Sequence, residues 1–330
     1  MHIPDNYLSP ATCAVLGAAM VPVWSVAMRK VKAELTRTRV PLLGISAAFA
    51  FLIMLFNVPA PGGTTAHAVG GTLIAALLGP WAACIAVSVA LLVQALLFGD
   101  GGIMAFGANC FNMAFVIPFA GYFVYRFLKD RFQGERAGLI CLGLGAYLGI
   151  NLAALCAAIE FGIQPAIAKD LAGLPLYCPY PLALAIPGMM LPHLLVAGFV
   201  EAGFTVSAFA FIRRVSPGSV HQGARTRIPA LYGLLGALVC LCPLGLLASG
   251  TAWGEWGAGE IRTALGNGRS LAFVPAGMTR GAALKALWPD YAVLGLPAWA
   301  GYLWSALAGA ACLVIVFKLL GLLRRAGTRA

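Results

Sequence analysis

A series of long, uninterrupted apolar runs limits this chain to very few folds. They lie at about 10–28, 40–58, 66–79, 81–98, 107–128, 137–160, 183–212, 228–249 and 297–323. Most are near the roughly 20 residues that a helix needs to cross the hydrocarbon core of a bilayer. Continuous apolar runs satisfy the backbone as helices, whereas membrane barrels alternate apolar and polar residues. The sequence therefore predicts an all-α integral membrane protein with about nine transmembrane helices.

The composition agrees with a membrane protein and excludes several soluble classes. Only 10% of the 330 residues are charged, against about 25% in soluble domains. The net charge of +11 comes mainly from basic residues in short loops, a topology signal that does not indicate a nucleic-acid partner. Eight of the nine cysteines lie inside apolar runs and no C-x-x-C pair occurs, so we interpret them as small packing residues.

Basic residues also predict the orientation. With nine spans and the N-terminus outside, the basic segments 29–39, 126–136, 213–227 and 318–329 all fall on the cytoplasmic side, where such residues concentrate. The segments assigned to the outside hold a single basic residue before position 250, Lys169. The first basic residues follow the first apolar run, which is unlike a secretory signal, so we expect the mature chain to keep its start.

Three regions follow from this pattern. Residues 1–213 form a predicted seven-helix binding bundle, 214–227 a basic cytoplasmic linker, and 228–330 a two-helix appendix. The outer loop of the appendix, 250–296, mixes Gly, Trp and charges of both signs. The sequence leaves the role of this loop open.

The opening "MHIPDNYLSP" places His2 beside the start methionine. Methionine is trimmed when the next residue is small, and histidine is large, so we expect Met1 to keep a free α-amine. That amine, the His2 amide nitrogen and the His2 imidazole could bind one metal ion through two small chelate rings. A deprotonated amide ligand favours Cu(II) or Ni(II) in a tetragonal geometry. The alternative is an incidental exposed histidine.

His67 is the candidate for the fourth nitrogen. It follows the Pro- and Gly-rich stretch "NVPAPGGTTAHAVGG", and an ionisable residue within a membrane segment indicates function by default. A packed histidine bonded to a neighbouring helix is the alternative. His221 lies in a basic cytoplasmic loop, and we expect it to be solvated.

Other polar residues could support the site from outside the ligand set. Asp5 and Asp100 could attract a cation or hold an imidazole N–H group. Asn109 and Asn112, or His193 with Glu201, could orient ligands, although hydrogen bonds between helices would explain them as well. Ala14 and Ala18 are spaced for close approach of a partner helix.

Several long motifs then resemble one known family. "MHIPDNYLSP", "NVPAPGGTTAHAVGGTLIAALLGPWA", "LLVQALLFGDGGIMAFGANCFNM" and "PHLLVAGFVEA" are similar to the substrate-binding membrane component of nickel/cobalt energy-coupling-factor transporters. The resemblance implies that the N-terminal strand folds back into the bundle and that Met1, His2 and His67 bind the metal in a square plane. Asn6 stands where that family usually has glycine, and we expect the turn to survive because asparagine tolerates positive φ.

The resemblance implies an importer of Ni²⁺ or Co²⁺ in a prokaryotic inner or plasma membrane, with the ion as cargo and no permanent cofactor. A transmembrane coupling subunit and two cytoplasmic ATPases would supply the energy, since this chain has no phosphate-binding loop. The region with "CPLGLLASGTAWGEWG" resembles the small accessory component, fused here as in the nickel branch. An ion-coupled secondary transporter or a membrane metalloenzyme remains open from the residues alone.

Overall fold

The structure is a computed structural model, and it describes residues 1–34, 39–219, 226–248, 250–256, 274–281 and 285–326, with side chains as far as residue 321. His221 and much of the predicted outer loop lie outside these ranges. All nine cysteines are free thiols.

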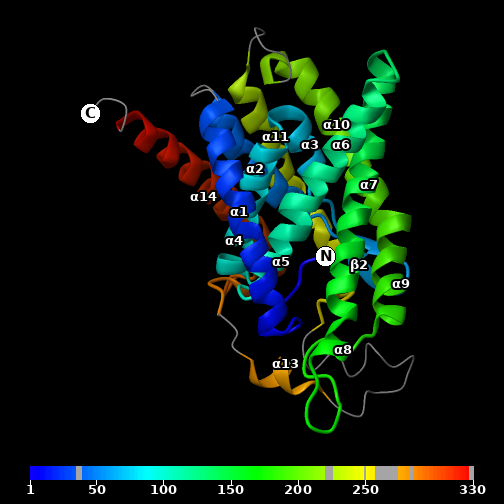
Figure 1. Cartoon of the computed structure of the whole chain (residues 1–330). Helices are drawn as coiled ribbons and strands as arrows, with labels where there is room; N and C mark the ends of the chain where they lie inside the picture. Colours follow the sequence, from blue (N-terminus) through cyan, green and yellow to red (C-terminus); the bar gives the residue numbers. More distant parts are fainter. Residues whose placement is uncertain (35–38, 220–225, 249, 257–273, 282–284, 327–330) are drawn as a thin grey trace.

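The described chain is a helical bundle with one short hairpin (Figure 1). Strands β1 (Val58–Ala60) and β2 (Thr64–Ala66) pair antiparallel. The α-helices are α1 (Pro10–Glu34), α2 (Val40–Met54), α3 (Gly71–Leu78), α4 (Pro80–Val93), α5 (Phe106–Asn109), α6 (Ile117–Lys129), α7 (Glu135–Gly162), α8 (Gln164–Ile167), α9 (Leu182–Pro192), α10 (Gly198–Val215), α11 (Ile228–Leu241), α13 (Ala276–Arg280) and α14 (Ala298–Ala326). Short 3₁₀ turns are η5 (Pro217–Ser219), η6 (Cys242–Leu247) and η7 (Pro289–Tyr291).

The all-α membrane class is confirmed. Within the described ranges, seven helical stretches are long and apolar enough to cross a membrane, and α2 is an apolar helix of 15 residues. The predicted span 66–79 differs, because its first residues are extended and α3 has only eight residues. At 1.5 Å per residue α3 is about 12 Å long, too short to cross alone. The count of nine spans and the orientation stay predictions.

Three π-helical turns interrupt the long helices close to the N-terminal strand. They are η2 (Gln94–Phe98) after α4, η3 (Cys110–Val116) after α5 and η4 (His193–Ala197) before α10. The turn η4 packs against both strands of the hairpin. Such turns cluster at functional sites because they shift side chains out of regular helical register.

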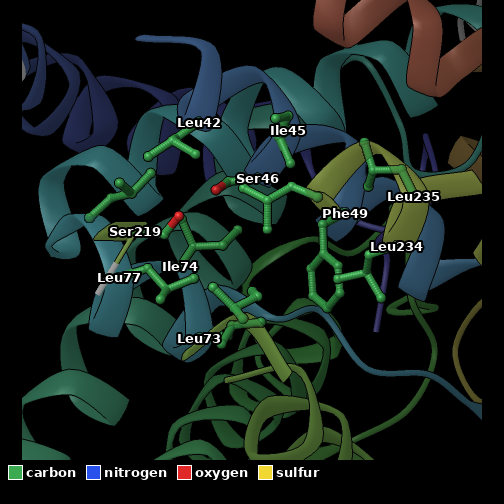
Figure 2. A pocket seen from close by; sticks show the side chains of 13 residues that line it. Leu42, Ile45, Ser46, Phe49, Leu73, Ile74, Leu77, Ser219, Leu234 and Leu235 are labelled. Atoms are coloured by element: carbon green, nitrogen blue, oxygen red, sulfur yellow. The ribbon is translucent and has the colours of Figure 1, made fainter. Parts of the chain in front are cut away.

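The C-terminal helices join the bundle through α2. Gly44 of α2 allows close packing, since a Cβ there would lie 3.0 Å from Phe317 Cβ of α14. Helix α11 also packs against α2. Figure 2 shows a small apolar cavity near this junction, lined by Phe49, Leu73 and Leu235 among others. The appendix is therefore packed onto the binding bundle over much of α2.

Candidate metal centre

The first residues of the chain form a buried strand inside the bundle. Met1, His2 and Ile3 are each at most 4% exposed, and Figure 1 shows the N-terminus within the molecule near β2. The Asn109 side chain binds both backbone polar groups of Ile3: its Oδ1 accepts from Ile3 N at 2.8 Å, and its Nδ2 donates to Ile3 O at 3.0 Å. Gly102 N donates to Ile3 O at 2.8 Å.

The turn after the strand has the geometry that its sequence requires. Asn6 has a φ of 69°, so the fold-back is present with asparagine in the left-handed conformation. Asp5 Oδ1 accepts from Met104 N at 2.8 Å. Gly102 must lack a side chain here, because a Cβ would lie 2.3 Å from the Asp5 carboxylate. Asp5 therefore fastens the strand to the loop after η2.

Asp100 lies against the His2 ring. Its Oδ1 is 3.0 Å from His2 Nδ1, and its Oδ2 accepts hydrogen bonds from Gln94 Nε2 and from the Tyr291 hydroxyl. Burial and the neighbouring Glu255 carboxylate raise the pKa of Asp100 above its ordinary value. Burial also lowers the pKa of His2 to about 4. The imidazole is therefore neutral near pH 7 and keeps a lone pair for a metal.

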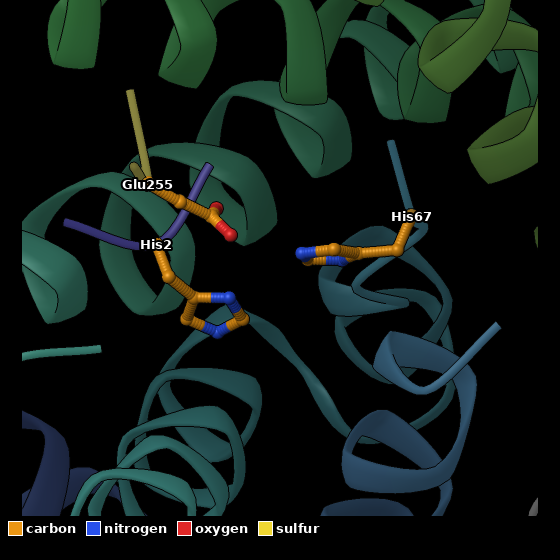
Figure 3. Close-up of side chains that lie close together, drawn as sticks. All are labelled: His2, His67 and Glu255. Carbon is orange, nitrogen blue, oxygen red and sulfur yellow. The ribbon is translucent and has the colours of Figure 1, made fainter. Parts of the chain in front are cut away.

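His67 follows β2 and reaches the same place from the other side. Its Nδ1 lies 3.1 Å from the carbonyl oxygen of Ala68, and the His2 and His67 rings stack at 5.0 Å between centroids. Figure 3 shows the His67 ring pointing toward His2 and Glu255. Nε2 of each ring is buried and has no hydrogen-bond partner among the described residues. Buried nitrogens without partners call for an explanation, and for His67 Nε2 a bound cation supplies one.

Glu255 completes the cluster from the C-terminal region. Its Oε1 accepts from the Met1 amine at 2.8 Å, and its carboxylate lies within 4.8 Å of a ring nitrogen of both His2 and His67. Burial is the largest single effect and opposes its charge, but the Met1 amine together with His2 and His67 outweighs burial and holds the pKa of Glu255 below its ordinary value. The segment is fixed by Trp253 N donating to Thr64 Oγ1 and by the Tyr7 hydroxyl donating to Trp256 O.

Of the residues proposed from the sequence, Met1, His2 and His67 lie together, with Asp100 and Asn109 in contact with the strand. Asn112 lies elsewhere in the bundle and donates to Glu160 Oε2 at 2.8 Å. His193 is buried in η4 with its Nδ1 2.7 Å from Met189 O. Ala14 and Ala18 lie on an exposed face of α1.

Sequence reasoning missed Glu255 and Tyr291, both from the loop whose role it left open. The available signal was weak: an acidic residue between two tryptophans in "TAWGEWG", and a tyrosine shortly before the last apolar run. Figure 3 shows Glu255 beside His2, with its carboxylate on the side that faces the His67 ring. The site thus lies between the binding bundle and the appendix.

A helical membrane bundle that buries a cluster of candidate nitrogen ligands is the arrangement expected of a metal transport protein. Residues 2–219 match the cobalt uptake substrate-specific transmembrane region, and residues 227–326 match the PDGLE domain. The chain belongs to the cobalt uptake substrate-specific transmembrane family of nickel and cobalt transport proteins, with a PDGLE domain after it. It is a multi-pass membrane protein of prokaryotic type.

Relatives with the same fused organisation are named as nickel transport proteins. The chain is 54% identical to a probable fused nickel transport protein LarMN of Lactiplantibacillus plantarum, over 97% of this chain and 96% of that one. It is 49% identical to the fused nickel transport protein NikMN of Rhodobacter capsulatus, over 99% and 100%. A crystal structure of a truncated transition metal transporter superposes with a TM-score of 0.62 at 55% identity, covering 65% of this chain and 99% of that one.

Proposed function

We propose that this chain is the substrate-binding component of an ATP-driven importer of the energy-coupling-factor type, and that it captures Ni²⁺, or Co²⁺, through Met1, His2 and His67. The observation that carries the proposal is a buried cluster. The Met1 amine donates to Glu255, whose carboxylate lies within 4.8 Å of a ring nitrogen of both His2 and His67. The Nε2 atom of His67 has no partner in the described part of the chain. The fused nickel relatives favour Ni²⁺.

The chelate is completed by the amide nitrogen of His2. Closing a ring from that amide to the imidazole requires Nδ1, because Nε2 is too far away along the side chain. Nδ1 faces Asp100 in the structure, so the ion would take the place of the proton there, and the neutral ring would carry its proton on Nε2 instead. A planar, nitrogen-rich site of this kind suits Ni(II) and Cu(II).

Charge balance supports the same ligand set. Before binding, the site holds one ammonium group on Met1, paired with Glu255. On binding, the amine loses its extra proton and the amide its only proton, because metal ligands must be deprotonated. A doubly charged ion with one amide anion again gives one net positive charge. Glu255 thus faces the same formal charge with and without the ion.

Energy would come from partners, as proposed from the resemblance: a transmembrane coupling subunit and two cytoplasmic ATPases. The exposed face of α1 around Ala14 and Ala18 is our candidate for the coupling contact. Glu160 and Glu201 bind different partners, Asn112 and the backbone of Val69 and Gly70. They form no direct link to each other, which gives little support to a carboxylate relay for an ion-coupled carrier.

The test is metal binding to the purified full chain, comparing Ni²⁺, Co²⁺, Cu²⁺ and Zn²⁺ by calorimetry and by the visible absorption of bound nickel. We expect tight Ni²⁺ binding with the spectrum of a four-nitrogen plane, and in His2→Ala and His67→Ala a Kd raised at least about a hundredfold with an altered spectrum. An unchanged Kd in either variant would contradict the site. In cells, uptake should require the ATPases, and uptake that survives ATP depletion would contradict the importer type.

A further inference from the structure

Glu201 is a fully buried carboxylate that contacts the loop carrying His67. It belongs to α10, and its side chain is 0% exposed. Oε2 accepts from Val69 N at 2.7 Å, and both carboxylate oxygens lie 3.0 Å from Gly70 N. Gly70 is the N-cap residue of α3, with a φ of 76° and no side-chain cap hydrogen bond. Glu201 accepts from the N–H groups of this residue and of the residue before it, so it fixes the backbone that enters α3.

The hydrogen bond from Val69 N to Glu201 matters most, because the peptide group that donates it also contacts His67. The N–H of Val69 and the C=O of Ala68 belong to one planar peptide unit. The C=O end of this unit lies 3.1 Å from His67 Nδ1, and the N–H end donates to Glu201. The peptide unit therefore stands between a carboxylate and an imidazole, with a hydrogen bond on each side.

This arrangement determines which nitrogen of His67 carries its proton. A carbonyl oxygen only accepts, so Nδ1 must donate to Ala68 O and Nε2 keeps its lone pair. Nε2 is the buried nitrogen without a partner in the described ranges. A carboxylate on the N–H end polarises the peptide and strengthens its carbonyl as an acceptor. Metal-binding histidines in general donate their second nitrogen to a carboxylate or a carbonyl oxygen.

We propose that Glu201 is a positioning residue for His67, acting through the Ala68–Val69 peptide to fix the ring's orientation and tautomer for metal binding. The proposal rests on the proposed function, since it assigns Glu201 a role toward one ligand of that site. It also ties the fourth nitrogen to α10, so that a displacement of α10 relative to α3 would move His67.

Simple capping of α3 does not explain all of these contacts. A hydroxyl or amide oxygen would cap a helix, whereas a charge buried among neutral groups is costly to desolvate. The chain also offers a matched comparison in Glu160, another buried carboxylate of the bundle. Glu160 accepts from Asn112 Nδ2 and has no contact with the His67 loop among the described interactions.

The experiment compares Glu201→Gln, Glu160→Gln, His67→Ala and the double variant His67→Ala with Glu201→Gln in the purified full chain. Calorimetry gives the Kd for Ni²⁺, absorption gives the ligand field of the bound ion, and melting without metal reports folding. We expect Glu201→Gln to weaken Ni²⁺ binding about 10- to 100-fold and to shift its spectrum toward that of His67→Ala. Glu160→Gln should match the wild type in both readouts.

The double variant separates positioning from general stability. If Glu201 acts through His67, Glu201→Gln changes the residual nickel affinity of His67→Ala by no more than experimental error. If the losses of nickel affinity in the two single variants add up in the double variant, the proposal is overturned. It is also overturned if Glu201→Gln lowers the melting temperature but leaves the spectrum at saturating nickel unchanged. Neither result contradicts the proposed function. Unchanged binding in His67→Ala overturns both. If Glu201→Gln does not fold, Glu201→Asp keeps the charge with a shorter reach, and an unaltered Kd there overturns the proposal.

Discussion

The position of the α-amine can be tested by changing the first residues in two ways. Inserting Ala between Met1 and His2 makes the start methionine removable, so the processed chain begins Ala-His and keeps an amine next to the histidine. Inserting Leu-Gly at the same place retains the methionine, because leucine is large, and moves the amine two residues away. Mass spectrometry of the purified chains confirms each N-terminus.

The structure sets the size of the effect. Two extended residues span about 6.6–7.2 Å, whereas the amine now lies 2.8 Å from Glu255 Oε1 and Met1 is 4% exposed. The displaced amine can therefore meet neither Glu255 nor the ion in its present place. Four-ligand zinc sites bind with about 10–16 kcal/mol, so one ligand contributes about 3 kcal/mol, or about a hundredfold in Kd. We expect at least that loss for the Leu-Gly variant.

The Ala variant is the matched control, and it should bind nickel close to the wild type while melting at a lower temperature, since the buried Met1 side chain is gone. The assay is calorimetry with Ni²⁺, repeated in the His67→Ala background. A Leu-Gly variant that binds nickel as tightly as the Ala variant, and still needs His67, would refute the amine as a ligand.

Three further perturbations test the surroundings of the site. Burial lowers the pKa of His2 from 6.5 to about 4, so on acidification the unfolded chain binds a proton before the folded chain does. The folded state therefore loses about 3 kcal/mol of stability as the pH falls from 6.5 toward 4. His2→Ala should show a smaller drop in melting temperature between about pH 7 and about pH 4.5 than the wild type. Glu255→Gln leaves the buried Met1 amine without its charged partner and should weaken nickel binding about tenfold. The control Asp130→Asn changes an exposed carboxylate and should bind nickel like the wild type. Equal nickel affinities of the two variants would argue against a role of Glu255 in the site. Tyr291→Phe removes the hydroxyl that donates to Asp100 and should lower stability by about 1 kcal/mol in denaturant unfolding, with no loss if that hydrogen bond is unimportant.

Features that depend on nearby residues could be predicted from the sequence. The helical membrane class follows from run length, and the pairing of amine, amide and imidazole follows from the place of His2 beside Met1. The turn at Asn6 follows from the few residue types that adopt positive φ, and its φ of 69° confirms that expectation. In each case the cause lies within a few residues of the effect.

Features that depend on tertiary contacts could not be predicted. Asn109 binds the N-terminal strand. The residues around Asn109 in the sequence do not distinguish this role from a hydrogen bond between helices, which is what Asn112, three residues later, forms with Glu160. The segment 66–79 is apolar enough to suggest a span, yet its first residues lie in β2 and in a non-helical stretch that Glu201 binds, and α3 begins only at Gly71. Glu255 meets Met1 across 254 positions of the chain.

The contacts of Glu255 and Tyr291 give a physical reason for the two regions to share one chain. Glu255 accepts a hydrogen bond from the Met1 amine. Tyr291 donates a hydrogen bond to Asp100, and Asp100 faces His2. Glu255 and Tyr291 both come from the region after residue 227, so a bundle without it would leave a buried ammonium group without its charged partner and a partly buried carboxylate without one of its hydrogen-bond donors, a costly state for either charge. Covalent linkage replaces a bimolecular association with an intramolecular one at high effective concentration. On the proposed function, fusion therefore keeps the acidic partners of the ligands in place at every round of capture.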